Sequence, residues 1–306
     1  MNEYAPNSPA GRREFITTAL KTASALALVS GPLAGLGGYP SRAGKEYTVQ
    51  EVIDIILKEI PGAPFSQTVD TIKCGNGGNR VSGIVTTMFA TIDVIHATIK
   101  NGADFIIAHE PTFYNHPDNL NFVPGNEIVK EKLDLLKQHN ITVWRFHDYW
   151  HAYKPDGIGY GVLKKIGWLP YYQAGKPVLN IPEIVLKELL SRLKENLGIE
   201  YLRFIGDLNQ RCGRIALLPG AAGGQRQISL VEREKPDVLI VGELSEWETA
   251  EYIRDARALG SKTALIVLGH SVSEEPGMEW LVEWLQPKTP GLKISHISSG
   301  NPFTWI

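Results

Sequence analysis

Residues 104–110 read Asp-Phe-Ile-Ile-Ala-His-Glu and are followed by Pro111. An apolar run this short, entered through the turn residues Asn101 and Gly102, is typical of a strand buried on both faces, as in a parallel sheet covered by helices. Ligands of open α/β sheets bind beyond the carboxyl ends of the strands. Because His109 and Glu110 stand at that point, the sequence predicts that this strand end belongs to a functional site.

Short apolar runs alternate with helical patterns on both sides of this stretch. Strands are predicted over residues 81–88, 104–108 and 141–146, and helices over residues 91–100 and 127–139. The third strand leads into a segment that reads His-Asp-Tyr-Trp-His over residues 147–151. Helical crossovers of this length connect neighbouring parallel strands, so we predict a βαβαβ unit.

The same order of elements returns in the second half of the chain. Strands are predicted over residues 214–218, 237–241 and 263–268, and helices over residues 225–234 and 245–259. A further helix is predicted over residues 184–197, with Pro182 near its first turn. We therefore predict an α/β fold built from two pseudo-repeated βαβαβ lobes.

The polar residues at these strand ends are imidazoles and carboxylates. Such groups are suitable ligands for zinc, manganese, iron or nickel, and no cysteine lies among them. Two pairs have a four-residue spacing, His147 with His151 and His270 with Glu274. The members of each pair share one face if their segment begins a helix. With His109 and Glu110 they give up to six ligands, which suits two metal ions that share a carboxylate.

The first 43 residues read as a signal peptide for twin-arginine (Tat) export. Residues 11–15 read Gly-Arg-Arg-Glu-Phe, an apolar stretch follows over residues 20–36, and residues 41–43 offer a cleavage site with small side chains. The apolar stretch contains Lys21 and Pro32 and is too polar for a stable transmembrane helix. We expect a periplasmic or otherwise exported protein without stable membrane insertion, whose lobes span residues 44–180 and 181–306.

Composition narrows the classes of partner. The chain has 306 residues, 43% hydrophobic and 21% charged, with a formal net charge of -2. No block rich in lysine or arginine follows the leader, so binding to nucleic acid or to an anionic membrane is not predicted, and a small-molecule partner is expected. The two cysteines, Cys74 and Cys212, are too far apart in sequence for one CxxC motif, and their pairing stays open.

Three motifs carry a resemblance to a known family. Residues 102–111 resemble the "gaDliitHHP" motif of the GTP cyclohydrolase type-two family, also called the Nif-three-like dinuclear-metal proteins. Residues 268–278, Leu-Gly-His-Ser-Val-Ser-Glu-Glu-Pro-Gly-Met, are similar to the family's "GHxxsExpG" motif, and residues 235–243 are similar to its "aDvyiTGe" segment. The last motif along the chain, at residues 268–278, is the most specific of the three.

The resemblance implies a Nif-three-like fold with a dinuclear site in the cleft between two lobes, and a ring-shaped homohexamer. It also implies that His109, His270 and Glu274 are metal ligands, with Glu274 as the bridge. The family's second adjacent histidine is Glu110 here, and the aspartate of its "HxxxD" loop falls on His151. Positions 110 and 151 together therefore keep one imidazole and one carboxylate. We predict two divalent ions per subunit, and the expected ligands are His109, Glu110, His151, His270 and Glu274.

These predictions favour a metal-dependent hydrolase that acts on a small phosphoester or amide. His147 and Asp148 are the expected proton-transfer residues, although Asp148 could replace the family's aspartate if the loop is shifted. Glu243 and Glu246 either line the cleft or stabilise the start of a helix. The competing hypothesis is a metal-binding protein that stores, delivers or scaffolds without turnover, and an open coordination position beside a pocket would favour catalysis.

The export hypothesis gives a direct test. Changing both Arg12 and Arg13 to Lys should leave unprocessed precursor in the cytoplasm, because Tat recognition depends on the paired arginines. Fractionation and immunoblotting of cells that express each form measure this outcome. Unchanged periplasmic levels of the double variant would contradict the hypothesis.

Overall fold

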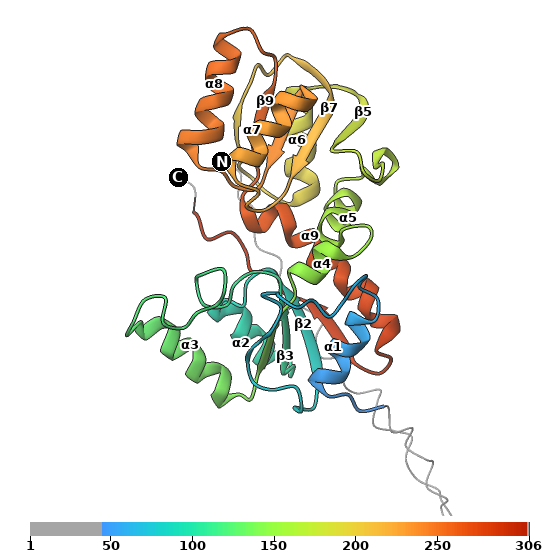
Figure 1. The fold of residues 1–306 in the computed structure, drawn as a ribbon, viewed down its shortest axis with the longest axis vertical. Coiled ribbons are helices and arrows are strands. Elements are labelled where there is room, and N and C mark those ends of the chain that lie inside the picture. The colour runs from blue at the N-terminus through green and yellow to red at the C-terminus, as the bar shows by residue number, and fades with distance from the viewer. Residues whose placement is uncertain (1–44, 305) are drawn as a thin grey trace, which may run out of the picture. The chain divides into compact units, whose positions relative to one another are not determined.

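The computed structural model describes residues 45–304 and residue 306 as an α/β protein with two five-stranded sheets (Figure 1). The predicted signal peptide lies outside the described residues. The strand order is β1-β4-β3-β2-β10 in the first sheet and β5-β7-β8-β9-β6 in the second. The predicted fold class is therefore confirmed.

The strands of the first sheet are β1 (Ile72–Cys74), β2 (Gly83–Thr87), β3 (Phe105–Ala108), β4 (Thr142–Arg145) and β10 (Lys293–His296). Those of the second sheet are β5 (Val178–Val185), β6 (Arg203–Ile205), β7 (Arg211–Leu218), β8 (Val238–Val241) and β9 (Ala264–Val267). In the first sheet β2, β3 and β4 are parallel neighbours, and in the second β7, β8 and β9 are parallel neighbours. Each sheet thus contains one of the two predicted βαβαβ units.

The α-helices are α1 (Val49–Leu57), α2 (Ile92–Lys100), α3 (Glu127–Gln138), α4 (Asp148–Ala152), α5 (Gly157–Lys165), α6 (Leu186–Leu197), α7 (Gly224–Glu234), α8 (Glu251–Ala258) and α9 (His270–Leu285). Short turns of other helices are η1 (Leu169–Tyr171), η2 (Glu246–Ala250) and η3 (Gln286–Lys288). Side chains cap the N-termini of several helices. Thr48 and Glu51 form a capping box at α1, and Thr91 caps α2.

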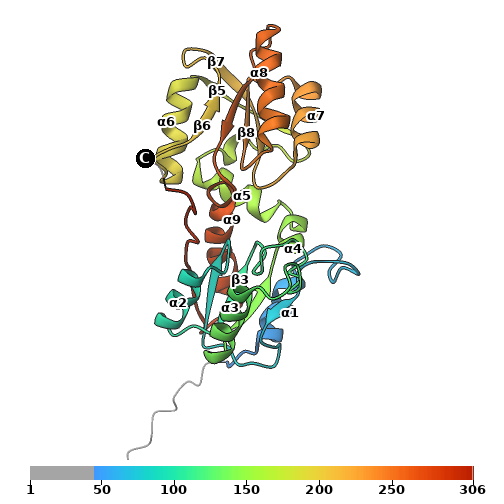
Figure 2. The same ribbon diagram turned by 90° about the vertical axis from the view of Figure 1, so that its left-hand side faces the viewer.

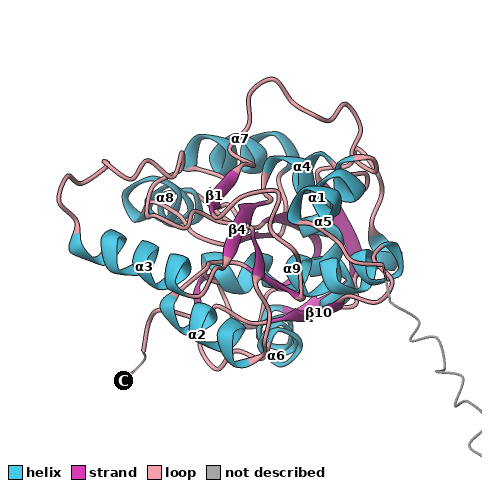
Figure 3. Ribbon diagram, turned by 90° about the horizontal axis from the view of Figure 1, so that it is seen from below, coloured by secondary structure: helices cyan, strands magenta, loops and turns pink. Residues whose placement is uncertain are grey.

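Helices cover both faces of each sheet. In the first lobe α2 and α3 pack on one face, and α1 and α9 lie on the other (Figures 1 and 3). In the second lobe α7 and α8 cover one face and α6 covers the other (Figure 2). One hydrophobic cluster runs through both lobes, from Ile84 and Trp144 of the first sheet, through Met278 of α9, to Ile215 and Ile240 of the second. The two lobes therefore share a continuous core.

The structure corrects two expectations for the second lobe. Pro182 lies inside strand β5 and not at the start of a helix, which begins at Leu186. Proline is tolerated there because β5 is an edge strand whose pairing with β7 is irregular between Asn180 and Ile184. The last strand, β10, returns to the first sheet and pairs in parallel with β2, so the C-terminal residues do not all belong to the second lobe.

Helix α9 leads from the second sheet to the first and crosses α5 very closely. A Cβ atom on Gly161 would lie 2.4 Å from the carbonyl oxygen of Pro276, and one on Gly277 would lie 2.6 Å from the Cα of Ile158. Side chains larger than hydrogen would push the two helices apart. The two glycines therefore allow the backbones of α5 and α9 to touch.

The remaining sequence expectations concern cysteine and the membrane. Cys74 and Cys212 are both buried and free, and they lie in different sheets. No helix within the described residues is long and apolar enough to span a bilayer.

Because α5 and α9 cross so closely, we predict that alanine substitutions at two glycines of α5 change the free energy of unfolding by different amounts. We expect Gly161→Ala to lower the free energy of unfolding by about 1–3 kcal/mol, because the added methyl group meets rigid backbone. Urea unfolding of the full-length chain, followed by tryptophan fluorescence, measures the change.

Gly159→Ala in the same helix is the control. Its Cβ would lie 3.5 Å from the nearest atom, Oδ1 of Asp156, so it should leave stability unchanged or raise it by up to about 1 kcal/mol. Equal effects of the two substitutions would show that the close crossing does not limit stability.

Candidate metal centre

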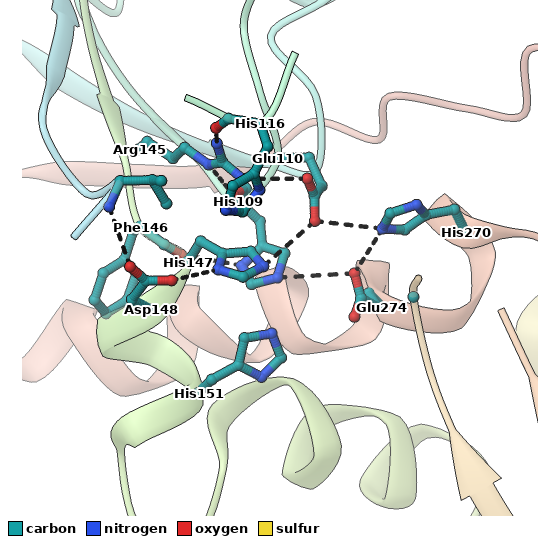
Figure 4. Close-up of polar contacts among 12 residues, drawn as sticks. His109, Glu110, His116, Arg145, Phe146, His147, Asp148, His151, His270 and Glu274 are labelled. Carbon is teal, nitrogen blue, oxygen red and sulfur yellow. Dashed lines mark hydrogen bonds and ion pairs between the residues drawn. The ribbon is translucent and has the colours of Figure 1, made fainter. Parts of the chain in front are cut away.

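The predicted polar residues follow parallel strands or begin the helices after them. His109 and Glu110 follow β3, His147 precedes α4, which carries His151, and α9 begins with His270 and carries Glu274. Both segments with the four-residue spacing are helical, as their spacing required. Figure 4 shows these side chains converging from three segments of the chain.

His109 is the most deeply buried of the four imidazoles. Its side chain has no solvent exposure, and its Nδ1 lies 3.0 Å from the carbonyl oxygen of Phe146. Burial lowers the pKa of His109 well below its usual range, and the neighbouring His151 and His147 lower it further. Because a carbonyl oxygen only accepts, Nδ1 must carry the proton, and the lone pair of Nε2 is free. That Nε2 is buried and has no hydrogen-bond partner, which is the expected state of a ligand atom.

The other imidazoles are held in the same way, each by an oxygen at Nδ1. The partners are Asp148 for His147 at 2.9 Å, Asp156 for His151 at 2.8 Å and Glu243 for His270 at 3.2 Å. An acceptor at Nδ1 fixes the ring and leaves Nε2 as the ligand atom, and metal-binding histidines are usually oriented like this. The arrangement therefore fits a site that binds metal through Nε2.

Two carboxylates complete the cluster. Nε2 of His270 lies 3.3 Å from Glu110 and 3.2 Å from Glu274, and Nε2 of His109 lies 3.8 Å from Glu274. Burial alone would lower the pKa of His270, but hydrogen bonds with Glu110, Glu243 and Glu274 raise it to about 12. The carboxylates thus create a strongly negative potential at this point, which favours a bound cation.

Two groups of ligand atoms could hold a metal ion. One consists of His109, His147 and His151, and the other of His109, Glu110 and Glu274, and the atoms within each group lie within 4.8 Å of one another. His147, which the sequence assigned to proton transfer, therefore also stands among potential ligands. The number and identity of the metal ions stay predictions.

Asp148 points away from the cluster. Its Oδ2 accepts hydrogen bonds from the Thr68 hydroxyl at 2.8 Å and from the Val69 backbone at 3.1 Å, while Oδ1 holds His147. The geometry favours His151 over Asp148 as the ligand from this segment. Asp148 acts on the site through the orientation of His147.

Two residues that the sequence analysis missed support the strand ends. Asp70 accepts the backbone N–H groups of His147, Asp148 and Tyr149 and so satisfies the free donors at the start of α4. Burial raises the pKa of Asp70, although those three hydrogen bonds oppose the rise. Asp70 lies in a turn-rich segment far from α4 in sequence, so no local pattern indicates its role.

Arg145 is the second missed residue. Its side chain is fully buried at the end of β4, and its Nε donates to the carbonyl of His109 at 3.2 Å. It also donates to the carbonyl of His116 and lies 3.4 Å from Glu110 and 3.6 Å from Asp118. Arg145 thereby pairs with Glu110, which stands where the family has its second histidine. Removing one partner from a buried ion pair typically lowers the free energy of unfolding by about 3–5 kcal/mol.

The second lobe brings a glycine against the cluster. Gly220, which follows β7, has a φ of +63°, and a Cβ there would lie 2.2 Å from Oε1 of Glu274. Its backbone N–H donates to the Ser273 hydroxyl of α9 at 2.9 Å. A residue with a side chain at this position would displace Glu274.

A cavity of about 630 Å³ opens beside the cluster. Its wall includes Glu110, His147, His151, His270 and Glu274, together with residues from the second lobe. His109 is not part of this wall and lies behind it. Glu243 is a partner of His270, whereas Glu246 pairs with Arg203 at the surface.

A profile of the family described as Duf34/NIF3 (NGG1p interacting factor 3) matches residues 47–302. The chain belongs to this family. The resemblance drawn from the three sequence motifs is thereby confirmed.

Curated relatives carry the name "GTP cyclohydrolase 1 type 2 homolog". The relative from Escherichia coli K12 is 27% identical over 261 residues, which cover 82% of this chain and 98% of that one. The relative from Clostridium acetobutylicum is 26% identical over 216 residues, or 67% of this chain and 76% of the other. A Bacillus cereus protein related to NIF3 shares the fold, with a TM-score of 0.66 and 14% identity over 86% of this chain and all of that one.

The geometry predicts different effects for the two candidate ligands after β4. We expect His151→Ala to weaken metal binding more than Asp148→Asn, because His151 lies within the cluster whereas Asp148 only orients His147. The effect of Asp148→Asn should stay within the about 10–100-fold typical of an outer hydrogen-bond partner. Calorimetric titration of the metal-free full-length proteins with Zn²⁺ or Mn²⁺ measures both affinities. A larger loss for Asp148→Asn would mean that the segment rearranges to present the carboxylate.

Proposed function

We propose that this Duf34/NIF3 protein is a metal-dependent hydrolase that acts on a small phosphoester or amide. The supporting observation is that the cluster of imidazoles and carboxylates forms part of the wall of a cavity of about 630 Å³. This volume lies within the range of small-molecule sites. An open cavity beside the ligands would give a small substrate access to the metal site, which favours catalysis over a purely structural role.

The donor set fits divalent transition metals. His109 offers a buried, unpartnered Nε2, and three further imidazoles have their Nδ1 occupied by an oxygen acceptor. We propose that His109, Glu110, His151, His270 and Glu274 would hold two ions, with Glu274 as the bridge that the family resemblance implies. Bound ions would supply a Lewis acid that activates water and binds an oxygen of the substrate.

Other side chains of the site have roles that do not depend on the positions of the metal ions. Asp148 holds the Nδ1 proton of His147, so that Nε2 of His147 can accept a proton on the side of the cavity. Burial raises the pKa of Glu110, but the hydrogen bond and charge of His270, followed by the charges of His147 and Arg145, lower it below its usual value. Glu110 is thus held as a carboxylate that can bind a cation.

Three further proposals come from the sequence and the family resemblance. The leader of residues 1–43 would direct the folded protein through the Tat pathway, which would allow metal loading before export. Nucleoside triphosphates are expected to be scarce outside the cytoplasm, so we propose that the substrate is not GTP in spite of the relatives' name. The homohexamer implied by the family resemblance is likewise a proposal.

The proposal predicts metal-dependent turnover. We expect the purified full-length protein, after metal analysis, to hydrolyse at least one compound in a panel of phosphoesters, nucleotides and amides, and to lose this activity after chelation. His147→Ala should lower kcat by about 10²–10⁴-fold, as expected for loss of a proton-transfer group, with the metal content kept. His139→Ala at the exposed end of α3 is the matched control and should leave both quantities unchanged.

The possible results separate the alternatives. Loss of metal in His147→Ala would make His147 a ligand and not a proton-transfer residue. Stoichiometric metal without turnover of any compound would favour the storage or scaffold function. Efficient turnover of GTP would contradict the proposed substrate class.

A further inference from the structure

The cavity beside the cluster has a second chemical feature in addition to the metal-binding groups. Arg226 and Lys176 both line it, from two different segments of the second half of the chain. Arg226 lies in the first turn of α7, and Lys176 precedes β5. Two cationic side chains therefore approach one cavity from separate elements.

Arg226 stands out among the arginines. Every other arginine in residues 45–304 makes an ion pair or a side-chain hydrogen bond, whereas the guanidinium of Arg226 makes neither within the described residues. The amine of Lys176 also has no ion pair or hydrogen bond there. Glu248 lies against Gly224 at the start of the same helix but forms no ion pair with Arg226.

The carboxylates of the cavity wall do not neutralise these cations. Glu110 and Glu274 lie beside His270, and Asp156 is bonded to His151. The acidic groups of the wall thus belong to the cluster or orient its imidazoles. Both cations are solvent-exposed and have no ion pair or hydrogen bond within the described residues, so their charge is available to an anionic ligand.

The wall also contains apolar side chains. Among them are Leu163 of α5, Leu179 of β5, and Leu217 and Leu218 of β7. Apolar walls with a few polar groups are typical of sites for small organic ligands, since the apolar surface binds the body and the polar groups fix its orientation. This cavity offers charge recognition by Arg226 and Lys176 in addition to the imidazole and carboxylate cluster.

We infer that the cavity binds an organic anion, whose charged group is held by Arg226 and Lys176 and whose apolar body lies against the leucines. This inference rests on the proposed function for one point, namely that the bound anion is the substrate of the hydrolase and presents its reacting bond to the cluster. The anion site itself requires no turnover. Carboxylates, sulfonates and phosphates all carry the negative charge that pairs with the two cations.

A pair of fluorescent probes tests the inference on chelated, full-length protein. The anionic probe is 1-anilinonaphthalene-8-sulfonate, and the neutral probe is N-phenyl-1-naphthylamine, which has a similar apolar body without the sulfonate. We expect Arg226→Ala to weaken binding of the anionic probe by about 10–100-fold, because a charge-assisted hydrogen bond is lost. The affinity for the neutral probe should change by less than about twofold, and Lys176→Ala should act in the same direction as Arg226→Ala.

Arg233→Ala is the matched control, since Arg233 lies on α7 but pairs with Glu234 and does not line the cavity. It should leave both affinities unchanged. Equal weakening of both probes by Arg226→Ala, or an unchanged affinity for the anionic probe, would overturn the inference. Competition with octanoate, octyl phosphate and octanol then identifies the preferred headgroup, and equal displacement by octanol would also overturn it.

These outcomes are distinct from those of the activity test. A charge-selective cavity in a protein that hydrolyses nothing would retain the anion site and reject the hydrolase. Turnover of neutral substrates only, with no effect of Arg226→Ala on either probe, would retain the hydrolase and reject the anion site.

Discussion

The placement of α9 between the two sheets is the constraint on which the site depends. This helix begins directly after β9 and carries His270 and Glu274, while its later residues pack on the first sheet. Hydrogen bonds fix it on both sides, because Thr86 of β2 donates to the carbonyl of Met278 and the backbone of Gly220 donates to Ser273. Glu274 is thereby brought beside His109, which is far from it in sequence. The site exists only when the two lobes are packed together.

Electrostatics then defines what the cluster can do. The imidazole of His109 is neutral because burial disfavours its charged form, and the oxygen acceptors at Nδ1 set the direction of all four rings. The carboxylates of Glu110, Glu243 and Glu274 all form hydrogen bonds with His270, so its imidazole holds a proton strongly. Protons and metal ions compete for the same lone pairs, so a metal ion at Nε2 of His270 would have to displace this proton.

Local sequence patterns predicted much of this architecture. The apolar run that ends in His109 and Glu110 indicated a buried parallel strand, and the four-residue spacing of His270 and Glu274 indicated one face of a helix. Both predictions depend on neighbouring residues alone. The sequence did not indicate that Pro182 lies in a strand, because an edge position with irregular pairing is a property of the whole sheet.

The supporting residues were missed for a related reason. Asp70 stabilises the start of α4 from a distant turn, and Arg145 reads as an ordinary charged residue at a strand end until its surroundings are known. Likewise, β10 joins the first sheet only because α9 carries the chain back to it. Each of these contacts joins segments that are far apart in sequence, and no period or spacing encodes them.

The two halves of the repeat have become unequal in what they contribute. In the first half the strand ends provide donor atoms, at His109, Glu110 and His147. In the second half the ends of β7 and β8 instead provide Gly220 and Gly242, where an added Cβ would lie 2.2 Å from Glu274 and 2.4 Å from the Ser273 hydroxyl. The donor atoms of this half come only from the segment after β9, at His270 and Glu274 of α9. The two glycines thus leave the empty volume in which α9 can present its carboxylate. A variant with side chains at both glycine positions would fill that space.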